Sequence, residues 1–285
     1  QGYSSAASDV YKRQIIDRDH KDAGYEGYMI FDADNILDVN YVSEMNKVFD
    51  NGYDILTSYR NSKNFDSNWI SAAYSLWFLR EARYLNNSRM QLGTSCAISG
   101  TGFLVGANVI EGNGGWIHHL LTEDIEFTCD SVSKGMKIGY ASKAVLYDEQ
   151  PTKFSQSYTQ RLRWAKGFYQ VFANYGGKLL KGVLKGSFSC LDMFMTVMPA
   201  MLLTLLSVLI NVVAIPVAIA TDAPETAILV QALIQTLVNF YGLFFILGLL
   251  TAITEWDQIH CVWYKKVLYF CLLYTSPSPR DMRRS

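Results

Sequence analysis

The sequence predicts an α/β domain followed by transmembrane α-helices, and two observations lead to this fold class. Residues 15–186 mix polar residues with short apolar runs and helical patterns, which is typical of a soluble α/β domain. Within residues 194–273, apolar residues instead gather in membrane-length stretches. A chain of 285 residues has room for one sizeable globular domain and such an appendage.

The first part of the α/β domain reads as strand, helix, strand. Residues 28–31 and 54–59 are short apolar runs of the kind that form buried strands. Between them, apolar residues at helical spacing predict a helix over 41–49 that ends at Asn51-Gly52. This order predicts a right-handed crossover in a parallel sheet. Further elements are expected as a helix over 67–85 and closing strands at 137–140 and 144–147.

The apolar part contains two stretches that are long enough to cross a membrane. Residues 194–219 carry no charge, and at about 1.5 Å per residue they exceed a hydrocarbon core of about 30 Å. The second stretch, 227–253, has Gln231, Gln235 and Asn239 on one helical face, where amides are expected to join helices. A third candidate span begins at residue 262.

The distribution of lysines predicts the orientation. The loop 221–226 contains no Lys or Arg, whereas Lys178, Lys181 and Lys185 precede the first span and Lys265 and Lys266 follow the second. By the positive-inside rule the α/β domain is expected on the cytoplasmic face of the cell (plasma) membrane. The lysines before the first span also alternate with leucines, as in a helix that lies on the inner leaflet.

The composition and the chain ends limit the interpretation further. With 25 Lys+Arg against 26 Asp+Glu, no global field attracts nucleic acid, and we expect no nucleic-acid partner. Five cysteines without a C-x-x-C pair argue against a disulfide framework and a zinc site. Residues 1–14 and 274–285 look like a non-native leader and tail, and we exclude them from the fold.

A first polar cluster, Asp32-Ala33-Asp34, ends the first predicted strand. Asp32 and Asp34 are expected at the carboxyl edge of the sheet and to point the same way. Two converging carboxylates repel unless a cation lies between them, and a hard divalent ion that also binds phosphate oxygens suits this position. We therefore expect Asp32 and Asp34 to bind Mg or Mn. A capping turn before the next helix would explain the same residues.

A second cluster, Thr122-Glu123-Asp124, has Thr122 at an expected N-cap and two acidic residues in the first helical turn. Transfer to a hydroxyl requires a base within hydrogen-bond reach, and Asp124 is the candidate, with His118 and His119 as alternatives. The glycine-rich stretch 112–116 is expected to be a flexible loop that shapes an acceptor pocket. Helix capping alone would also explain this cluster.

The third cluster is Gln160-Arg161-Leu162-Arg163-Trp164. On a helix, Gln160, Arg163 and Trp164 share a face and Arg161 lies on its flank. Guanidinium groups neutralise a departing diphosphate through bidentate hydrogen bonds, and an indole offers a flat surface to a sugar ring. The alternative is an interfacial helix whose Arg and Trp residues anchor at lipid headgroups.

Together with Ser99-Gly100-Thr101-Gly102, these clusters resemble the membrane-integrated family 2 glycosyltransferases, which include the cellulose, chitin, hyaluronan and poly-N-acetylglucosamine synthases. The resemblance covers residues 15–253 and implies a partial GT-A domain and inverting sugar transfer. It implies that Asp34, helped by Asp32, holds Mg or Mn on the UDP diphosphate and that Asp124 deprotonates the acceptor. The other implied site residues are Gln160, Arg161 and Arg163 for the donor diphosphate and Trp164, Ser99, Gly100, Thr101 and Glu123 for the acceptor.

The resemblance implies an enzyme, a hexosyltransferase that moves a sugar from a UDP donor to a hydroxyl of a polysaccharide or lipid acceptor, with export partners at the membrane. Such enzymes begin with a strand and a Pro-x-Tyr-Asn-Glu-like segment that bind uracil and ribose, and nothing before Asp32 resembles them. We therefore expect an internal fragment that binds nucleotide sugars poorly and turns over little.

Two other function classes stay open. A phosphatase of the haloacid dehalogenase type also carries D-x-D after a strand, but it requires Thr or Val where this chain has Ile36. A non-catalytic membrane subunit of a polysaccharide export system has no physical need to keep Asp34, Asp124, Arg163 and Trp164 together.

Overall fold

The centre of the molecule is a five-stranded sheet with the order β1-β4-β3-β5-β2. A computed structural model describes residues 24–221, 224 and 226–272, so the expected leader (1–14) and tail (274–285) lie outside the described residues. The strands are β1 (Gly27–Ile30), β2 (Ile36–Leu37), β3 (Ile55–Ser62), β4 (Phe103–Gly106) and β5 (Ile138–Asp148).

The sheet is mixed, whereas the sequence predicted a parallel one. β3 and β5 run parallel, but β4 is antiparallel to both β1 and β3 and lies between them. β1 and β3 therefore run in the same direction, as the strand–helix–strand pattern predicted, without being neighbours. The strands expected at 137–140 and 144–147 form the single strand β5, whose register on β3 shifts between Ser58 and Tyr59.

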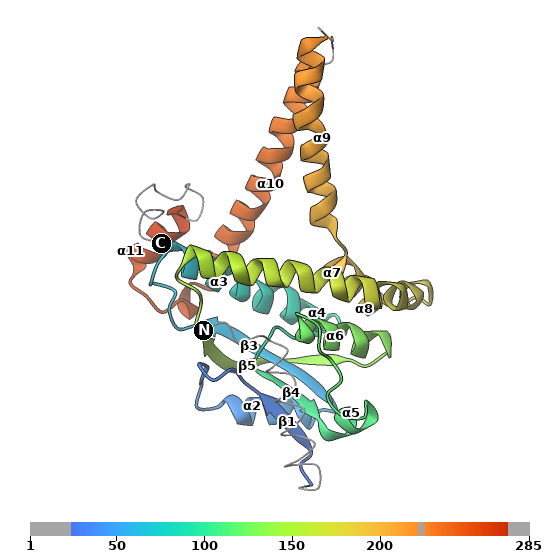
Figure 1. The fold of residues 1–285 in the computed structure, drawn as a ribbon. Helices are drawn as coiled ribbons and strands as arrows, with labels where there is room; N and C mark the ends of the chain where they lie inside the picture. The colour runs from blue at the N-terminus through green and yellow to red at the C-terminus, as the bar shows by residue number, and fades with distance from the viewer. Residues whose placement is uncertain (1–23, 222–223, 225, 273–285) are drawn as a thin grey trace.

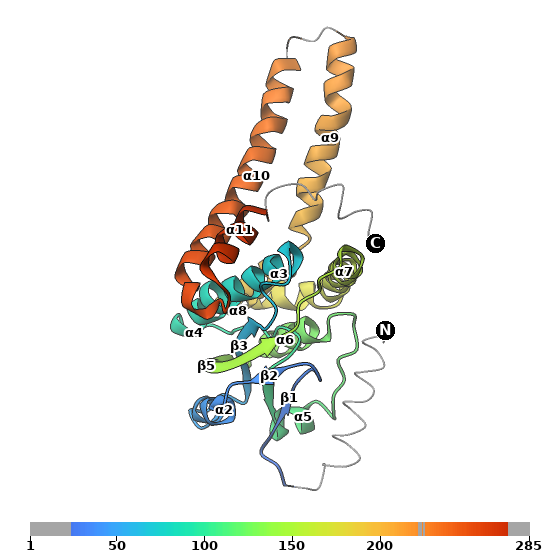
Figure 2. The ribbon, with the colours of Figure 1, turned by 90° about the vertical axis from the view of Figure 1, so that its left-hand side faces the viewer.

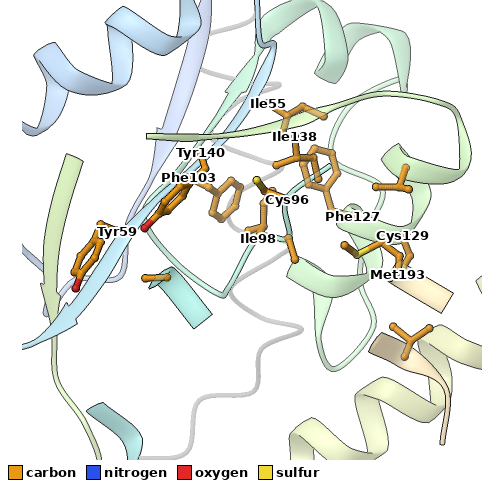
Figure 3. Close-up of a cluster of buried hydrophobic side chains, with 14 of the residues drawn as sticks. Ile55, Tyr59, Cys96, Ile98, Phe103, Phe127, Cys129, Ile138, Tyr140 and Met193 are labelled. Atoms are coloured by element: carbon orange, nitrogen blue, oxygen red, sulfur yellow. The ribbon is translucent and has the colours of Figure 1, made fainter. Parts of the chain in front are cut away.

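Helices cover both faces of the sheet (Figure 2). On one face α2 (Tyr41–Phe49) buries Tyr41 and Met45 against strand residues such as Leu56. The other face is covered by α6 (Glu123–Ser133), α7 (Phe154–Leu184) and α8 (Phe188–Val197). Figure 3 shows Phe103 and Ile138 of the sheet gathered with Phe127 of α6 in this larger core. A short helix, α5 (Ala107–Gly112), follows β4.

The helix expected over 67–85 is present, but it changes its hydrogen-bond pattern part of the way along. α3 (Trp69–Arg80) begins after Asn68, whose side chain accepts hydrogen bonds from the backbone N–H groups of Ile70 and Ser71. It continues into a π-helical segment, η2 (Glu81–Asn86), and then into α4 (Asn87–Gln91). π-Helical turns are rare and frequently lie at functional sites, so η2 identifies this region as part of a candidate site.

Two apolar helices project together from the α/β part (Figure 1). They are α9 (Ala200–Ala220) and α10 (Thr226–Thr254). In the described part of the chain, α10 alone is long and apolar enough to cross a bilayer, with a mean hydropathy of 2.0. The stretch 194–219 is not one helix, because α8 ends at Val197 and α9 begins after Pro199. Near the third candidate span lies α11 (Trp263–Leu272).

Ion pairs attach the segments before and after this helical hairpin to the helix that contains η2. On α8, which precedes the hairpin, Asp192 Oδ2 lies 2.6 Å from Arg89 Nε. Directly after the C-terminal end of α10, Glu255 Oε1 lies 3.3 Å from Arg83 Nε, and the Tyr59 hydroxyl donates a hydrogen bond to the same carboxylate. Both carboxylates therefore contact the segment between Arg83 and Arg89.

The start of α6 packs closely on α7 at a glycine. A Cβ added to Gly167 would lie 2.5 Å from both Oγ1 and Cγ2 of Thr122, the residue that precedes α6. Gly177, two to three turns further along α7, has no neighbour within 4 Å of the equivalent position. The absent side chain at Gly167 therefore brings the third sequence cluster next to the second.

These two glycines provide a matched test of the packing. Gly167→Ala is expected to lower the melting temperature by several degrees, because an overpacking cost of about 1–3 kcal/mol exceeds the roughly 1 kcal/mol helix-propensity gain of alanine. Gly177→Ala has the same propensity gain and no contact, so it should leave the melting temperature unchanged or raise it. Thermal unfolding of the two purified variants measures the difference. Equal melting temperatures would contradict the close packing of α6 and α7.

Candidate active site

The Asp32-Ala33-Asp34 cluster forms a turn directly after β1, with both carboxylates exposed. The turn is closed by a hydrogen bond from the Asn35 backbone N–H to the Asp32 carbonyl at 3.1 Å. The Asp32 backbone N–H in turn donates to Thr101 Oγ1 at 2.9 Å. This contact joins the first cluster to the Ser99–Gly102 loop, although the two are separated by almost seventy residues.

A buried ion pair lies beneath this turn. Arg60 Nε donates to Asp148 Oδ2 at 3.0 Å, and Asn35 Nδ2 donates to the other oxygen of the same carboxylate at 3.1 Å. Arg60 Nη1 also donates to the Ser99 carbonyl at 2.8 Å. The guanidinium carbon lies 3.7 Å from the centre of the Phe78 ring of α3, within cation–π range. One side chain of β3 therefore contacts β5, the Ser99–Gly102 loop and α3.

The sequence analysis did not select Arg60 or Asp148. Neither belongs to a recognisable motif, and their contact is between positions 88 residues apart. One signal was available: Asp148 directly follows a predicted strand, and Arg60 follows another. Polar residues at the carboxyl ends of strands in α/β folds are candidates for ligand sites.

Asp124 lies half-buried in the first turn of α6, beside the Ser99–Gly102 loop. A Cβ added to Gly100 would lie 3.9 Å from Asp124 Oδ2 and 3.4 Å from Arg60 Nη1. Burial and the neighbouring Glu123 raise the pKa of Asp124 to about 6, against hydrogen bonds from the backbone of Ile125 and Gly100 that lower it. A general base works best with a pKa near the working pH, so this position suits proton removal.

The side-chain cap expected at Thr122 is absent. Thr122 occupies the N-cap position, but its side chain forms no cap hydrogen bond and is instead buried against Gly167. Glu123 is half-buried next to Asp124. The acidic pair therefore stands at the end of α6 without the side-chain cap that the alternative interpretation expected.

The residues just before the second cluster belong to the core. Trp116 is 3% exposed and packs against Phe103 and Phe127, so the prediction that it shapes a flexible acceptor loop is wrong. His118 is also buried and lies 3.1 Å from the Asp130 carboxylate. Burial opposes ionisation of Asp130, but hydrogen bonds from His118 and Lys134 lower its pKa to about 2. His119 is exposed, and its Nδ1 lies 2.9 Å from the Ile117 carbonyl, so Asp124 is the better base.

The third cluster lies on α7 and packs on α3. The Trp164 ring centre lies 5.7 Å from that of Tyr74 and 6.2 Å from that of Phe78. Arg161, expected on the flank, contacts α3 as well, because its Nε donates to the Tyr74 hydroxyl at 3.3 Å. Phe78 therefore contacts both Trp164 and Arg60, which connects the α7 cluster to the site.

Gln160 and Arg163 differ from their neighbours. Both side chains are half-buried, and within the described part of the chain neither forms a hydrogen bond or an ion pair with another residue. A guanidinium without such a partner has all five donors available to a ligand. The position of Arg163 is therefore compatible with the predicted diphosphate contact.

The side chains of Asp32 and Asp34 fit a divalent ion that is bound together with a diphosphate. Among the described residues, no group of three or more His, Cys, Asp and Glu side chains lies close enough to hold an ion alone. Asp32 and Asp34 nevertheless place two exposed carboxylates on one turn. Mg is commonly bound by one or two carboxylates and the phosphate oxygens of a substrate, so a diphosphate would complete the coordination.

The raised pKa of Asp124 predicts a pH-dependent cost to stability. Its folded-state value of about 6 lies above an unfolded value of about 3.9, so the native state binds more protons between these values and stability falls as pH rises through that window. At about pH 8, Asp124→Asn should therefore have a free energy of unfolding higher than that of the unmodified protein, on the order of 1–3 kcal/mol. At about pH 4 this difference should be smaller.

Thermal unfolding at the two pH values tests this expectation. Asp50→Asn, a substitution at an exposed aspartate that ends α2, serves as the matched control and should show no pH-dependent difference. A stability gain for Asp124→Asn that is the same at both pH values would mean that ionisation of this carboxyl is not its source.

Comparison with known proteins gives one family and two relatives. Residues 29–221 match the family described as "Glycosyl transferase family group 2". The chain is 31% identical over 84 residues to the "Probable glycosyltransferase YdaM" of Bacillus subtilis (strain 168), covering 30% of this chain and 20% of that protein. It is 27% identical over 92 residues to the "Beta-monoglucosyldiacylglycerol synthase" of Synechocystis sp., covering 32% of this chain and 19% of that protein. The aligned part thus spans about a fifth of each relative.

Proposed function

The chain belongs to glycosyl transferase family group 2, and on that basis we propose that it moves a sugar from a UDP donor to a hydroxyl of a glycan or lipid acceptor with inversion at the anomeric carbon. The observation that carries the proposal is the meeting of the D-x-D turn, the Ser99–Gly102 loop and Asp124 at one edge of the sheet. The Thr101 hydroxyl joins the turn to the loop, and a hydrogen bond from the Gly100 backbone joins the loop to Asp124.

In the proposed arrangement, the donor diphosphate lies against the turn after β1. Asp34 and Asp32 would hold a Mg or Mn ion, which neutralises charge on the departing diphosphate when it is bound. Gln160 and Arg163, which have no hydrogen-bond or ion-pair partner among the described residues, would bind the same diphosphate, with Arg161 beside them. The described residues thus offer both cationic and amide donors to an anionic leaving group.

The acceptor would lie between Asp124 and the Ser99–Gly102 loop. As its hydroxyl oxygen forms a bond to the anomeric carbon, the bond from that carbon to the diphosphate breaks and the proton passes to Asp124. A carboxyl with a pKa of about 6 is mostly ionised at neutral pH, yet is a stronger base than an ordinary aspartate. Ser99, Gly100, Thr101 and Glu123 would shape the acceptor side, and Trp164 would offer its ring to the acceptor sugar.

We further propose that the protein is integral to the cell membrane, with the α/β part on the cytoplasmic face. α10 supports this location, because most of its apolar side chains are exposed and only 6% of its most apolar window is buried. The lysines of the last turns of α7 would then face anionic lipid. One relative is named a glucosyldiacylglycerol synthase, so a lipid acceptor is as compatible as a growing polysaccharide with export partners.

The decisive experiment measures UDP release from a panel of UDP-sugars by membranes that contain the full-length protein. Release should require Mn or Mg, and Asp124→Asn should lower it by about 100-fold or more, which is typical of the loss of a general base. Asp34→Asn should lower release and raise the metal concentration needed for half-maximal rate. Asp50→Asn is the matched control and should keep the unmodified rate.

Two outcomes would contradict the proposal. Release of inorganic phosphate together with a trappable aspartyl-phosphate, both lost in Asp32→Asn, would identify a phosphatase. Metal-dependent binding of UDP-sugars without release, unchanged in Asp124→Asn, would identify a non-catalytic subunit. Membership in a glycosyltransferase family argues against the first outcome.

A further inference from the structure

The π-helical segment η2 places an additional carboxylate at the candidate site. Glu81, its first residue, lines a small pocket together with Arg60, Phe78, Ser99 and Thr101. An α-helix gives each side chain a fixed direction, and a π-helical turn changes that direction for the residues at its start. Glu81 belongs to none of the three polar clusters, so no motif assigns it a role.

Glu81 and Arg60 hold Ser99 from two sides. Ser99 Oγ donates to Glu81 Oε2 at 3.3 Å, while the Ser99 carbonyl accepts from Arg60 Nη1 at 2.8 Å. The next residue, Gly100, has a φ of +74°, a backbone conformation that favours glycine. Its backbone faces the Asp124 carboxylate. The position of Gly100 relative to Asp124 therefore depends on the two contacts that fix Ser99.

The surroundings of the two carboxyl groups differ in charge. Burial raises the pKa of Glu81 above its usual range, and Arg60 of β3, the Ser99 hydrogen bond, Arg89 of α4 and Arg80 of α3 act against that rise. Asp124 faces the carboxyl groups of Glu123 on its own helix and of Glu81 on η2. The cations are thus arranged around Glu81, and Asp124 has acidic neighbours.

We propose that Glu81 is a positioning residue for the transfer reaction: through its hydrogen bond with Ser99 it holds the Ser99–Gly100 segment against Asp124. This inference rests on the proposed function, because it assumes that Asp124 removes the acceptor proton. Glu81 would act through Ser99, without touching either substrate.

The first test compares Glu81→Ala, which removes the hydrogen-bond acceptor for Ser99, with Glu81→Gln, which keeps it. Glu81→Ala should lower kcat for UDP release by about tenfold, because Ser99 loses its partner, and the conservative Glu81→Gln should keep kcat near the unmodified value. Glu111→Ala, at an exposed residue of α5, is the matched control and should leave kcat unchanged.

The second test is Ser99→Ala, which removes the same hydrogen bond from the other side. It should also lower kcat by about tenfold, because the positioning contact is lost. An unmodified kcat in Glu81→Ala or in Ser99→Ala would overturn the role of the contact. Circular dichroism of both variants establishes that they fold, and Ser99→Ala retains its force if Glu81→Ala does not fold.

Failure of this inference and failure of the proposed function give different results. If Asp124→Asn abolishes UDP release while Glu81→Ala keeps the unmodified kcat, the transferase assignment stands and Glu81 has no positioning role. If the unmodified protein releases no UDP from any donor, the proposed function itself fails, and the role of Glu81 fails with it.

Discussion

The arrangement of the site depends on the pairing of one guanidinium group. Arg60 is nearly buried, and it meets the Asp148 carboxylate, the Ser99 carbonyl and the Phe78 ring at the same time. Leaving either member of a buried ion pair without its partner costs about 3–5 kcal/mol, so alternative arrangements of these segments are strongly disfavoured. β3, β5, α3 and the loop before β4 are thereby held in a single relative position, to which the D-x-D turn is joined through Asn35.

The helix α6 shows how the surroundings decide what a carboxylate can do. Asp124 and Asp130 lie on this helix under two turns apart, yet their pKa values shift in opposite directions. Asp130 has His118 and Lys134 as partners and remains ionised. Asp124 has a buried position and acidic neighbours, which destabilise its charge and raise its pKa to about 6. The fold tolerates the cost of a destabilised charge at Asp124 and avoids it at Asp130, as expected if Asp124 is a functional group.

Local patterns predicted the elements and the polar clusters well, but not the contacts between them. The helix at 41–49 and the strand before Asp32 follow from hydrophobic spacing within a few residues. β4 is only four residues long, and its insertion between β1 and β3 depends on pairings with distant segments, which no local pattern encodes. For the same reason Arg60 and Glu81 were missed, and Trp116 was assigned to a loop although three aromatic partners place it in the core. Motif residues whose role depends on a ligand, such as Arg163, stay predictions.

The two ion pairs at the base of the apolar hairpin connect it to the candidate site. Asp192 on α8 and Glu255, directly after α10, bind Arg89 and Arg83 respectively. These two arginines are six positions apart, and Glu81 begins the π-helical segment that contains Arg83. A change in the distance or angle between α9 and α10 would therefore act first on η2, beside the pocket that Glu81 lines.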